Sequence, residues 1–129
     1  MLQIIVILFC ATAIFLLASI NTRRLMRRFL ARACTGSRWR RRFPDASKSE
    51  ICEFLDIFVE AFGFKQSWRL CFTPEDRVMD VCRALYPWRG YLDGMELTNL
   101  VLDLEKRYRV DICGSWRADI TLAELFSQT

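Results

Sequence analysis

Residues 2–20, LQIIVILFCATAIFLLASI, form one continuous apolar stretch near the start of the chain. No Asp, Glu, Lys or Arg occurs in these 19 residues. As an α-helix rising 1.5 Å per residue, the stretch is about 28 Å long, close to the roughly 30 Å hydrocarbon core of a bilayer. A chain of 129 residues is too small to bury such a helix on every side. The sequence therefore predicts a transmembrane anchor at residues 1–20.

A cleaved signal peptide is the alternative interpretation of this stretch. Signal peptides have basic residues before a shorter apolar core of about 7–15 residues, and small residues at the cleavage site. Here only the amino terminus carries charge before the apolar run, and Ala18-Ser19-Ile20 is a poor cleavage site. The basic residues that follow would also oppose export. We therefore favour an uncleaved anchor.

Residues 21–43, NTRRLMRRFLARACTGSRWRRRF, form an arginine block without any acidic residue. Positive flanks of membrane helices stay in the cytoplasm, so we expect a single-pass protein of a bacterial inner membrane with its C-terminal domain cytoplasmic. The three- and four-residue spacing of the first arginines predicts that the helix continues into the headgroup layer and binds anionic lipid headgroups. The arginines assigned to lipid headgroups are Arg23, Arg24, Arg27, Arg28, Arg32, Arg38, Arg40, Arg41 and Arg42.

Nucleic-acid binding is a second hypothesis for the arginine block. Trp39 lies between Arg38 and Arg40, and an aromatic side chain among arginines can stack on bases. A basic block next to a membrane anchor is more often a topology and lipid signal, so we favour lipid headgroups as its partners. Cys34 lies close to the membrane but carries only a weak acylation signal.

The net charge of the chain conceals two regions of opposite sign. The whole chain has 19 Lys and Arg against 15 Asp and Glu, a net charge of +4. Nine of the basic residues and none of the acids lie in residues 21–43, so the part beyond them carries ten bases against fifteen acids, a net charge of −5. The sequence therefore predicts a basic stalk that carries an acidic domain, and an acidic domain suggests a basic partner.

The domain after the stalk is predicted to be entirely helical. Pro44 interrupts the helical pattern, because proline disfavours helix at the residue before it. We divide the chain into the anchor at residues 1–20, a basic juxtamembrane stalk and linker at residues 21–46, and a helical domain at residues 47–129. No long alternating run typical of a strand appears. The predicted fold is thus all-α, with a single transmembrane helix and a small bundle of three or four helices.

Caps and apolar spacing locate the helices of the domain. The stretch 64–72 lacks a helix start and reads as a loop, whereas residues 110–112 read as an extended exit that buries two apolar side chains. The predicted helix starts are Ser47 with Glu50 as a capping box, the TPED sequence at residues 73–76, Asp93 with Glu96, and Thr121 with Glu124. Gly63 is predicted to end the helix that starts at Ser47.

The stretch from Leu92 to Phe126 resembles acyl carrier proteins. The matching phrases are LDGMEL at residues 92–97, LEKRY at 104–108, VDI at 110–112, ITLAELF at 120–126 and, earlier, TPED at 73–76. The resemblance implies an acyl-carrier-like helical bundle. The serine that carries the phosphopantetheine arm in that family corresponds to Tyr91 here, so the closer resemblance is to acyl-carrier-like proteins of unknown function, and no cofactor is expected.

The residue types needed for common catalytic chemistry are scarce. The chain has no histidine, which excludes His-containing catalytic pairs and His-containing metal sites. Its six cysteines include no C-x-x-C pair, and its five glycines form no phosphate-binding loop. We predict that the chain is not an enzyme, holds no metal, and uses Cys52 and Cys82 as ordinary buried residues.

Binding to another protein is the predicted function. By the resemblance, the acidic helix after Asp93 would contact a partner, while aromatic residues at the prosthetic-group position would anchor it. The hypothesis is a membrane-anchored, non-catalytic, acyl-carrier-like interaction module or adaptor on the cytoplasmic face. The alternatives are an atypical acyl carrier protein, and lipid or nucleic-acid binding through the arginine block. The candidate partner-binding residues are Asp93, Glu96, Asp103, Glu105, Trp88 and Tyr91.

Overall fold

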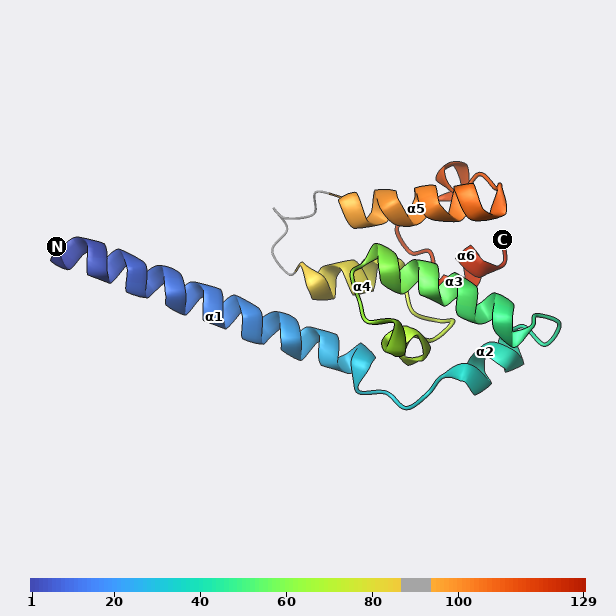
Figure 1. The fold of residues 1–129 in the computed structure, drawn as a ribbon, viewed down its shortest axis with the longest axis horizontal. Coiled ribbons are helices and arrows are strands. Elements are labelled where there is room, and N and C mark those ends of the chain that lie inside the picture. Colours follow the sequence, from blue (N-terminus) through green and yellow to red (C-terminus); the bar gives the residue numbers. More distant parts are fainter. Residues whose placement is uncertain (87–93) are drawn as a thin grey trace.

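The computed structural model of the chain describes residues 1–86 and 94–129. These residues are helical apart from their connections, and their only β-pairing is an isolated bridge between Arg77 and Thr121. The all-α prediction is therefore confirmed (Figure 1). The elements are α1 (Leu2–Leu30), α2 (Gly36–Arg42), α3 (Lys48–Ala61), the 3-10 helix η1 (Gln66–Cys71), α4 (Val78–Leu85), α5 (Met95–Tyr108), the 3-10 helix η3 (Cys113–Ser115) and α6 (Leu122–Phe126).

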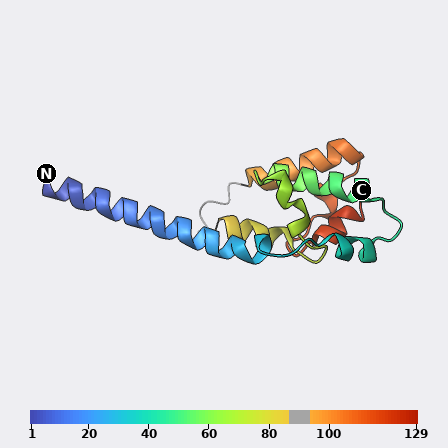
Figure 2. The ribbon, with the colours of Figure 1, turned by 60° about the horizontal axis from the view of Figure 1, so that its bottom comes forward.

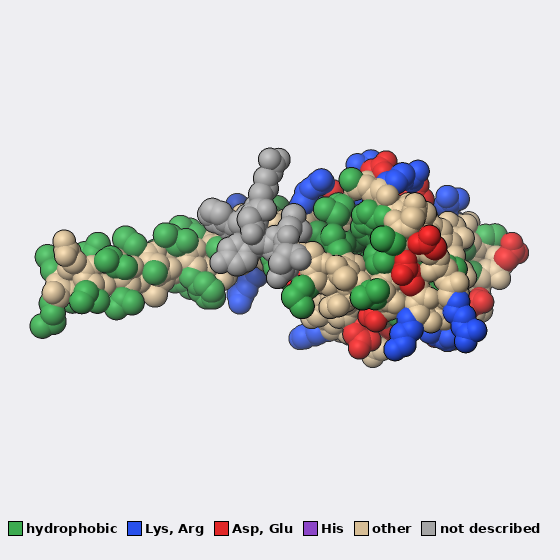
Figure 3. All heavy atoms as spheres, turned by 90° about the horizontal axis from the view of Figure 1, so that it is seen from above, with side chains coloured by type: hydrophobic (Ala, Val, Ile, Leu, Met, Phe, Trp, Pro, Cys, Tyr) green, Lys and Arg blue, Asp and Glu red, His purple; other side chains and the backbone are tan. Residues whose placement is uncertain are grey.

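Helix α1 projects from the domain formed by the other helices (Figures 1 and 2). Its most apolar 18 residues have a mean hydropathy of 2.6, and none of them is buried inside the structure. Figure 3 shows apolar side chains along this helix and basic side chains where it meets the domain. By length and composition α1 is able to cross a membrane, and a signal sequence meets the same criterion. The predicted continuation into the arginine block is confirmed, because the helix runs unbroken to Leu30.

The local signals for several helix ends are confirmed. Ser47 and Glu50 form the predicted capping box at the start of α3, and Thr121 and Glu124 form another at the start of α6. Each pair satisfies backbone donors that the first helical turn leaves free. Gly63, just beyond α3, has a φ of 68°, which is the left-handed conformation expected at a helix end.

Two predicted boundaries are wrong. The expected loop at residues 64–72 contains the 3-10 helix η1. The expected start at residues 73–76 is a turn, because the Asp76 carboxylate accepts a hydrogen bond from the Thr73 amide at 2.7 Å, and α4 begins only at Val78. At the expected extended exit, Ile112 is buried but has helical backbone angles, and Val110 is half-buried.

The hydrophobic core reaches into the segment that we assigned to the stalk. Met26 and Phe29 of α1 and Trp39 of α2 are buried together with the helices of the domain. Trp39 packs against Phe54 of α3 and Phe126 of α6, with ring centroids 6.1 and 5.9 Å away. The end of α1 and the Trp39 side chain of α2 thus pack with the domain, although the sequence analysis assigned this segment to the stalk and linker.

Candidate functional site

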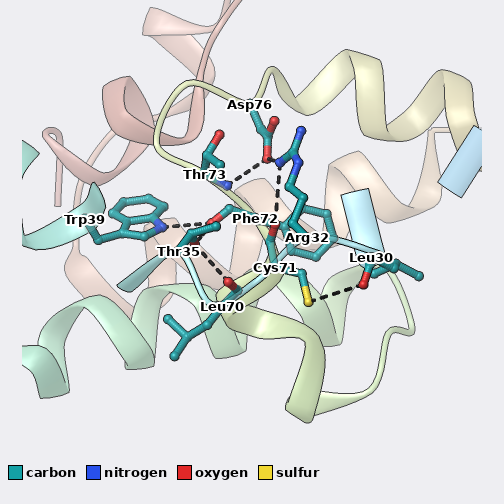
Figure 4. A network of polar contacts seen from close by, with 9 residues as sticks. All are labelled: Leu30, Arg32, Thr35, Trp39, Leu70, Cys71, Phe72, Thr73 and Asp76. Atoms are coloured by element: carbon teal, nitrogen blue, oxygen red, sulfur yellow. Dashed lines mark hydrogen bonds and ion pairs between the residues drawn. The ribbon is translucent and has the colours of Figure 1, made fainter. Parts of the chain in front are cut away.

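A network of polar contacts lies where the end of α1 meets the domain, and we call it the junction. It joins residues 30–39 to residues 70–76 (Figure 4). The Thr35 amide donates to the Leu70 carbonyl at 2.8 Å. The Thr35 hydroxyl lies 2.8 Å from the same carbonyl and 2.7 Å from that of Phe72, and donates to one at a time. These contacts fix the chain directly after α1 against the segment after η1.

Arg32 and Asp76 form the charged centre of the junction. The Arg32 guanidinium lies 2.6 Å from the Asp76 carboxylate, which is 8% exposed, and Arg32 itself is 31% exposed. The same guanidinium donates to the Cys71 carbonyl at 3.4 Å and lies over the Phe29 ring. The Thr73 amide donates to the same carboxylate oxygen, Oδ2, which therefore accepts from two donors in a place with little water. The pair therefore ties the chain just after α1 to the turn before α4.

Trp39 is part of the junction and faces the core. Its side chain is fully buried, and its Nε1 donates to the Phe72 carbonyl at 2.9 Å. It is therefore not available to stack on a base, although we had considered that role for it. The nucleic-acid hypothesis loses its aromatic contact, and only the arginine charges remain in its favour.

The arginine block divides into three groups. Arg32 is paired with Asp76 within the junction, and its assignment to lipid headgroups stays a prediction. A second group is exposed around the final turns of α1, and a third is exposed on α2, at the end of the domain far from the N-terminus in both ribbon views (Figures 1 and 2). After the membrane position that the sequence predicts for the apolar segment, we name them the membrane-proximal group, which is Arg23, Arg24, Arg27 and Arg28, and the membrane-distal group, which is Arg38, Arg40, Arg41 and Arg42.

The candidate partner-binding residues have mixed positions. Trp88, Tyr91 and Asp93 lie outside the described residues. Glu96 accepts a hydrogen bond from the Tyr86 hydroxyl. Glu105 accepts from the amides of Ile112 and Cys113 at 3.0 and 2.9 Å, which holds the chain that follows α5. Of the acids expected to contact a partner, Glu96 and Glu105 are thus engaged within the fold, whereas Asp103 is exposed.

Two exposed apolar side chains lie on the outer face of α5, where the sequence analysis considered only the acidic residues. Met95 and Leu102 are 62% and 56% exposed. They lie seven residues apart, so they share one face of the helix. The sequence could have predicted their exposure, because their spacing places neither of them on the buried side of the helix with Leu100 and Leu104.

The cysteines differ in burial. Cys82 is buried as predicted, and burial, with the nearby Glu96 charge, raises its pKa to about 12. Cys52 is only partly buried, so that prediction was wrong in degree. Burial also raises the pKa of the Cys71 thiol, with a smaller contribution from Cys34. Among the residues that the structure describes, no cluster of three or more cysteine or acidic side chains is placed to hold a metal ion.

Comparison with known proteins gives one partial similarity. No family model matches the chain, and no solved structure matches it. The chain is similar to the propanediol dehydratase small subunit of Citrobacter freundii, with 36% identity over 56 residues, which is 43% of this chain and 31% of that protein. The same subunit from Salmonella typhimurium is 34% identical over 56 residues, again 43% of this chain and 31% of that protein.

These findings overturn the acyl carrier resemblance. The phrases on which it rested are helix caps and core positions, and any small helical bundle needs such residues. The similarity that is found is to a different protein, and the chain spans about a third of the length of the curated relatives it matches. The expected likeness to acyl-carrier-like proteins of unknown function is therefore wrong.

Proposed function

We propose that the chain is a single-pass protein of a bacterial inner membrane whose cytoplasmic helical domain is a non-catalytic protein-interaction module. One observation carries the proposal: a single unbroken helix is apolar and exposed at one end and packed into the domain at the other. The apolar segment of such a helix is stable in the hydrocarbon core of a bilayer, and the packed end of the helix then holds the domain next to the membrane surface.

The polar groups of the apolar segment support a position inside a bilayer. The Thr12 hydroxyl donates to the Phe9 carbonyl, and the Ser19 hydroxyl donates to the Phe15 carbonyl, both at 2.9 Å. Both hydroxyls therefore find partners within their own helix, as hydrocarbon requires. Ser19 also lies at the poor cleavage site and is helical on both sides, which favours an anchor over a signal peptide.

The membrane-proximal arginines support the orientation. They are exposed on the two helical turns after the apolar segment, where Arg23 and Arg24 lie in the headgroup layer and Arg27 and Arg28 follow one turn later. Each basic side chain near an anionic surface contributes about 1 kcal/mol, so the four together contribute about 4 kcal/mol at low salt. Positive flanks of membrane helices are retained in the cytoplasm, and this supports a cytoplasmic position for the domain.

Two experiments test the anchor and its orientation. The protein is expected to stay in the pellet after carbonate extraction of membranes and to keep its intact mass of 15.2 kDa. Green fluorescent protein fused after Thr129 should fluoresce, while alkaline phosphatase fused there should be inactive. Release by carbonate, a shortened N-terminus or active phosphatase would each contradict the proposal.

A role as a component of an enzyme assembly is a second candidate. The partial relatives are by name small subunits of propanediol dehydratase, and a subunit acts in association with other chains. That relation supports an interaction module and raises the specific proposal that the partner is a dehydratase. Purification of the membrane form, followed by mass spectrometry of the associated chains, separates the candidates. Dehydratase chains recovered at stoichiometric amounts favour the second candidate, and unrelated chains favour the first.

A further inference from the structure

The four membrane-distal arginines occupy the solvent side of α2. Trp39 points into the core from the middle of this helix, and the neighbouring arginines fan out around the rest of its circumference. All four are exposed. Among the described residues none of them forms an ion pair, and the one ring contact is Arg42 over Phe43. Four positive charges thus stand on a seven-residue helix without an anion.

These arginines lie beyond the reach of the membrane that holds the anchor. From Thr22 to Leu30 the helix advances about 12 Å past the apolar segment, whereas the headgroup layer is about 5–7 Å thick on each side. Helix α2 lies farther along the molecule in the same direction (Figures 1 and 2). Electrostatic attraction is screened over about 8 Å at physiological salt. The distal charges are therefore free for a different anionic partner.

A shallow hollow adjoins this basic surface. It has a volume of about 440 Å³ and lies between the end of α2, the end of α5 and α6. Its apolar lining comes from Phe43, Pro44 and Phe126, and Arg42 stands at its edge. Tyr108 also lines the hollow, and its hydroxyl oxygen is buried and has no hydrogen-bond partner among the described residues. An unsatisfied buried hydroxyl costs about 1–3 kcal/mol, and a ligand that displaced the Tyr108 side chain enough to supply a partner would recover it.

We propose that the distal arginines and this hollow form a docking site for an acidic segment of a partner protein, with an apolar side chain of that segment in the hollow. The proposal deepens the interaction role proposed above and rests on it. A protein segment fits better than a nucleic acid, because the aromatic ring of Trp39 is not available for base stacking. The acids Asp45 and Glu50 line the hollow beside its apolar residues, so the hollow suits an uncharged apolar side chain, while the carboxylates of the segment meet the arginines, whose planar groups bind both oxygens of a carboxylate.

The test uses the full-length protein in nanodiscs of phosphatidylcholine, so that no anionic lipid competes. The probe is a short fluorescein-labelled peptide of glutamates interrupted by one leucine and one phenylalanine, and binding is read by fluorescence anisotropy at physiological salt. The triple variant Arg38→Gln, Arg40→Gln, Arg41→Gln should bind the peptide at least about tenfold more weakly. The matched control Arg23→Gln, Arg24→Gln, Arg28→Gln loses the same charge on α1 and should stay within about twofold of the wild type.

One further protein variant and one altered peptide test whether the hollow contributes to binding beyond the charge of the arginines. Tyr108→Phe should weaken the peptide severalfold while leaving the urea midpoint of the protein unchanged or raised, because it removes an unsatisfied hydroxyl. A peptide with serine in place of leucine and phenylalanine should also bind more weakly. Equal effects of the two triple variants, no binding by the wild type, or tighter binding of a single-stranded oligonucleotide of equal charge would each overturn the proposal.

Failure of this site and failure of the membrane role give different results. If the chain is not a membrane protein, it fails to enter nanodiscs before any peptide is added. If only the docking site is wrong, the chain enters nanodiscs and the two triple variants bind the peptide alike. Because the substituted arginines are exposed, we expect the variants to keep the urea midpoint of the wild type. Measuring these midpoints verifies that the variants are folded.

Discussion

Replacing Asp76 by alanine removes the acceptor that Arg32 and the Thr73 amide share at the junction. The Thr73 amide belongs to a buried residue, and leaving it without an acceptor costs about 2 kcal/mol. The ion pair adds about 1 kcal/mol, a discounted figure because nearly a third of the Arg32 side chain is exposed to screening solvent. We expect the free energy of unfolding to fall by about 3 kcal/mol.

Urea unfolding of the full-length protein in detergent, followed by tryptophan fluorescence, measures this change. With a urea dependence of about 2 kcal/mol per molar, the midpoint should fall by about 1.5 M. The matched control is Asp80→Ala, which breaks the exposed pair with Arg83 at 3.2 Å and should cost no more than about 0.5 kcal/mol. If the two variants have the same midpoint, the junction does not hold the domain as the structure indicates.

Three other predictions concern single side chains. Trp39→Phe loses the buried bond to the Phe72 carbonyl and part of the core volume, and should lower the free energy of unfolding by about 2 kcal/mol in the same urea assay. The hydrogen bond from the Thr121 amide lowers the pKa of the Glu124 carboxyl group. The ionised carboxylate therefore stabilises the fold at pH values above the ordinary glutamate pKa, and this stabilisation is lost as the pH falls through the lowered pKa. The urea midpoint of the wild type should therefore exceed that of Glu124→Gln at neutral pH, and the two should converge in acid; a constant difference would contradict this. Burial raises the pKa of Cys82 to about 12, so iodoacetamide at mildly alkaline pH should label exposed Cys113 and spare Cys82 until urea is added, as peptide mass spectrometry will show.

The features that sequence reasoning predicted are those with a local cause. The capping boxes at Ser47 and Thr121 need only a partner three residues away, and the apolar segment of α1 needs only its own composition. The left-handed turn at Gly63 is likewise decided by one residue. Such signals remain valid whatever the rest of the chain does.

The features that it missed depend on distant residues. Arg32 and Asp76 are 44 positions apart, and Trp39 and Phe72 are 33 apart, so no spacing rule connects them. The arginines of α1 and α2 look like one block in the sequence, and only the fold separates them. The acyl carrier resemblance failed for a related reason, since caps and apolar spacing describe helices in general and say little about which bundle they build.

In the membrane position proposed for α1, its unbroken run from the apolar segment into the core couples the tilt of the helix to the position of the domain. A membrane helix tilts by about 20° on average, and the tilt changes with bilayer thickness. Without a hinge between the apolar segment and the junction, such a tilt swings α2 sideways by about a third of its distance from the pivot. Lipid composition would thereby set the angle at which the domain meets its neighbours, and a partner fixed in the same membrane would sense bilayer thickness as a change in reach.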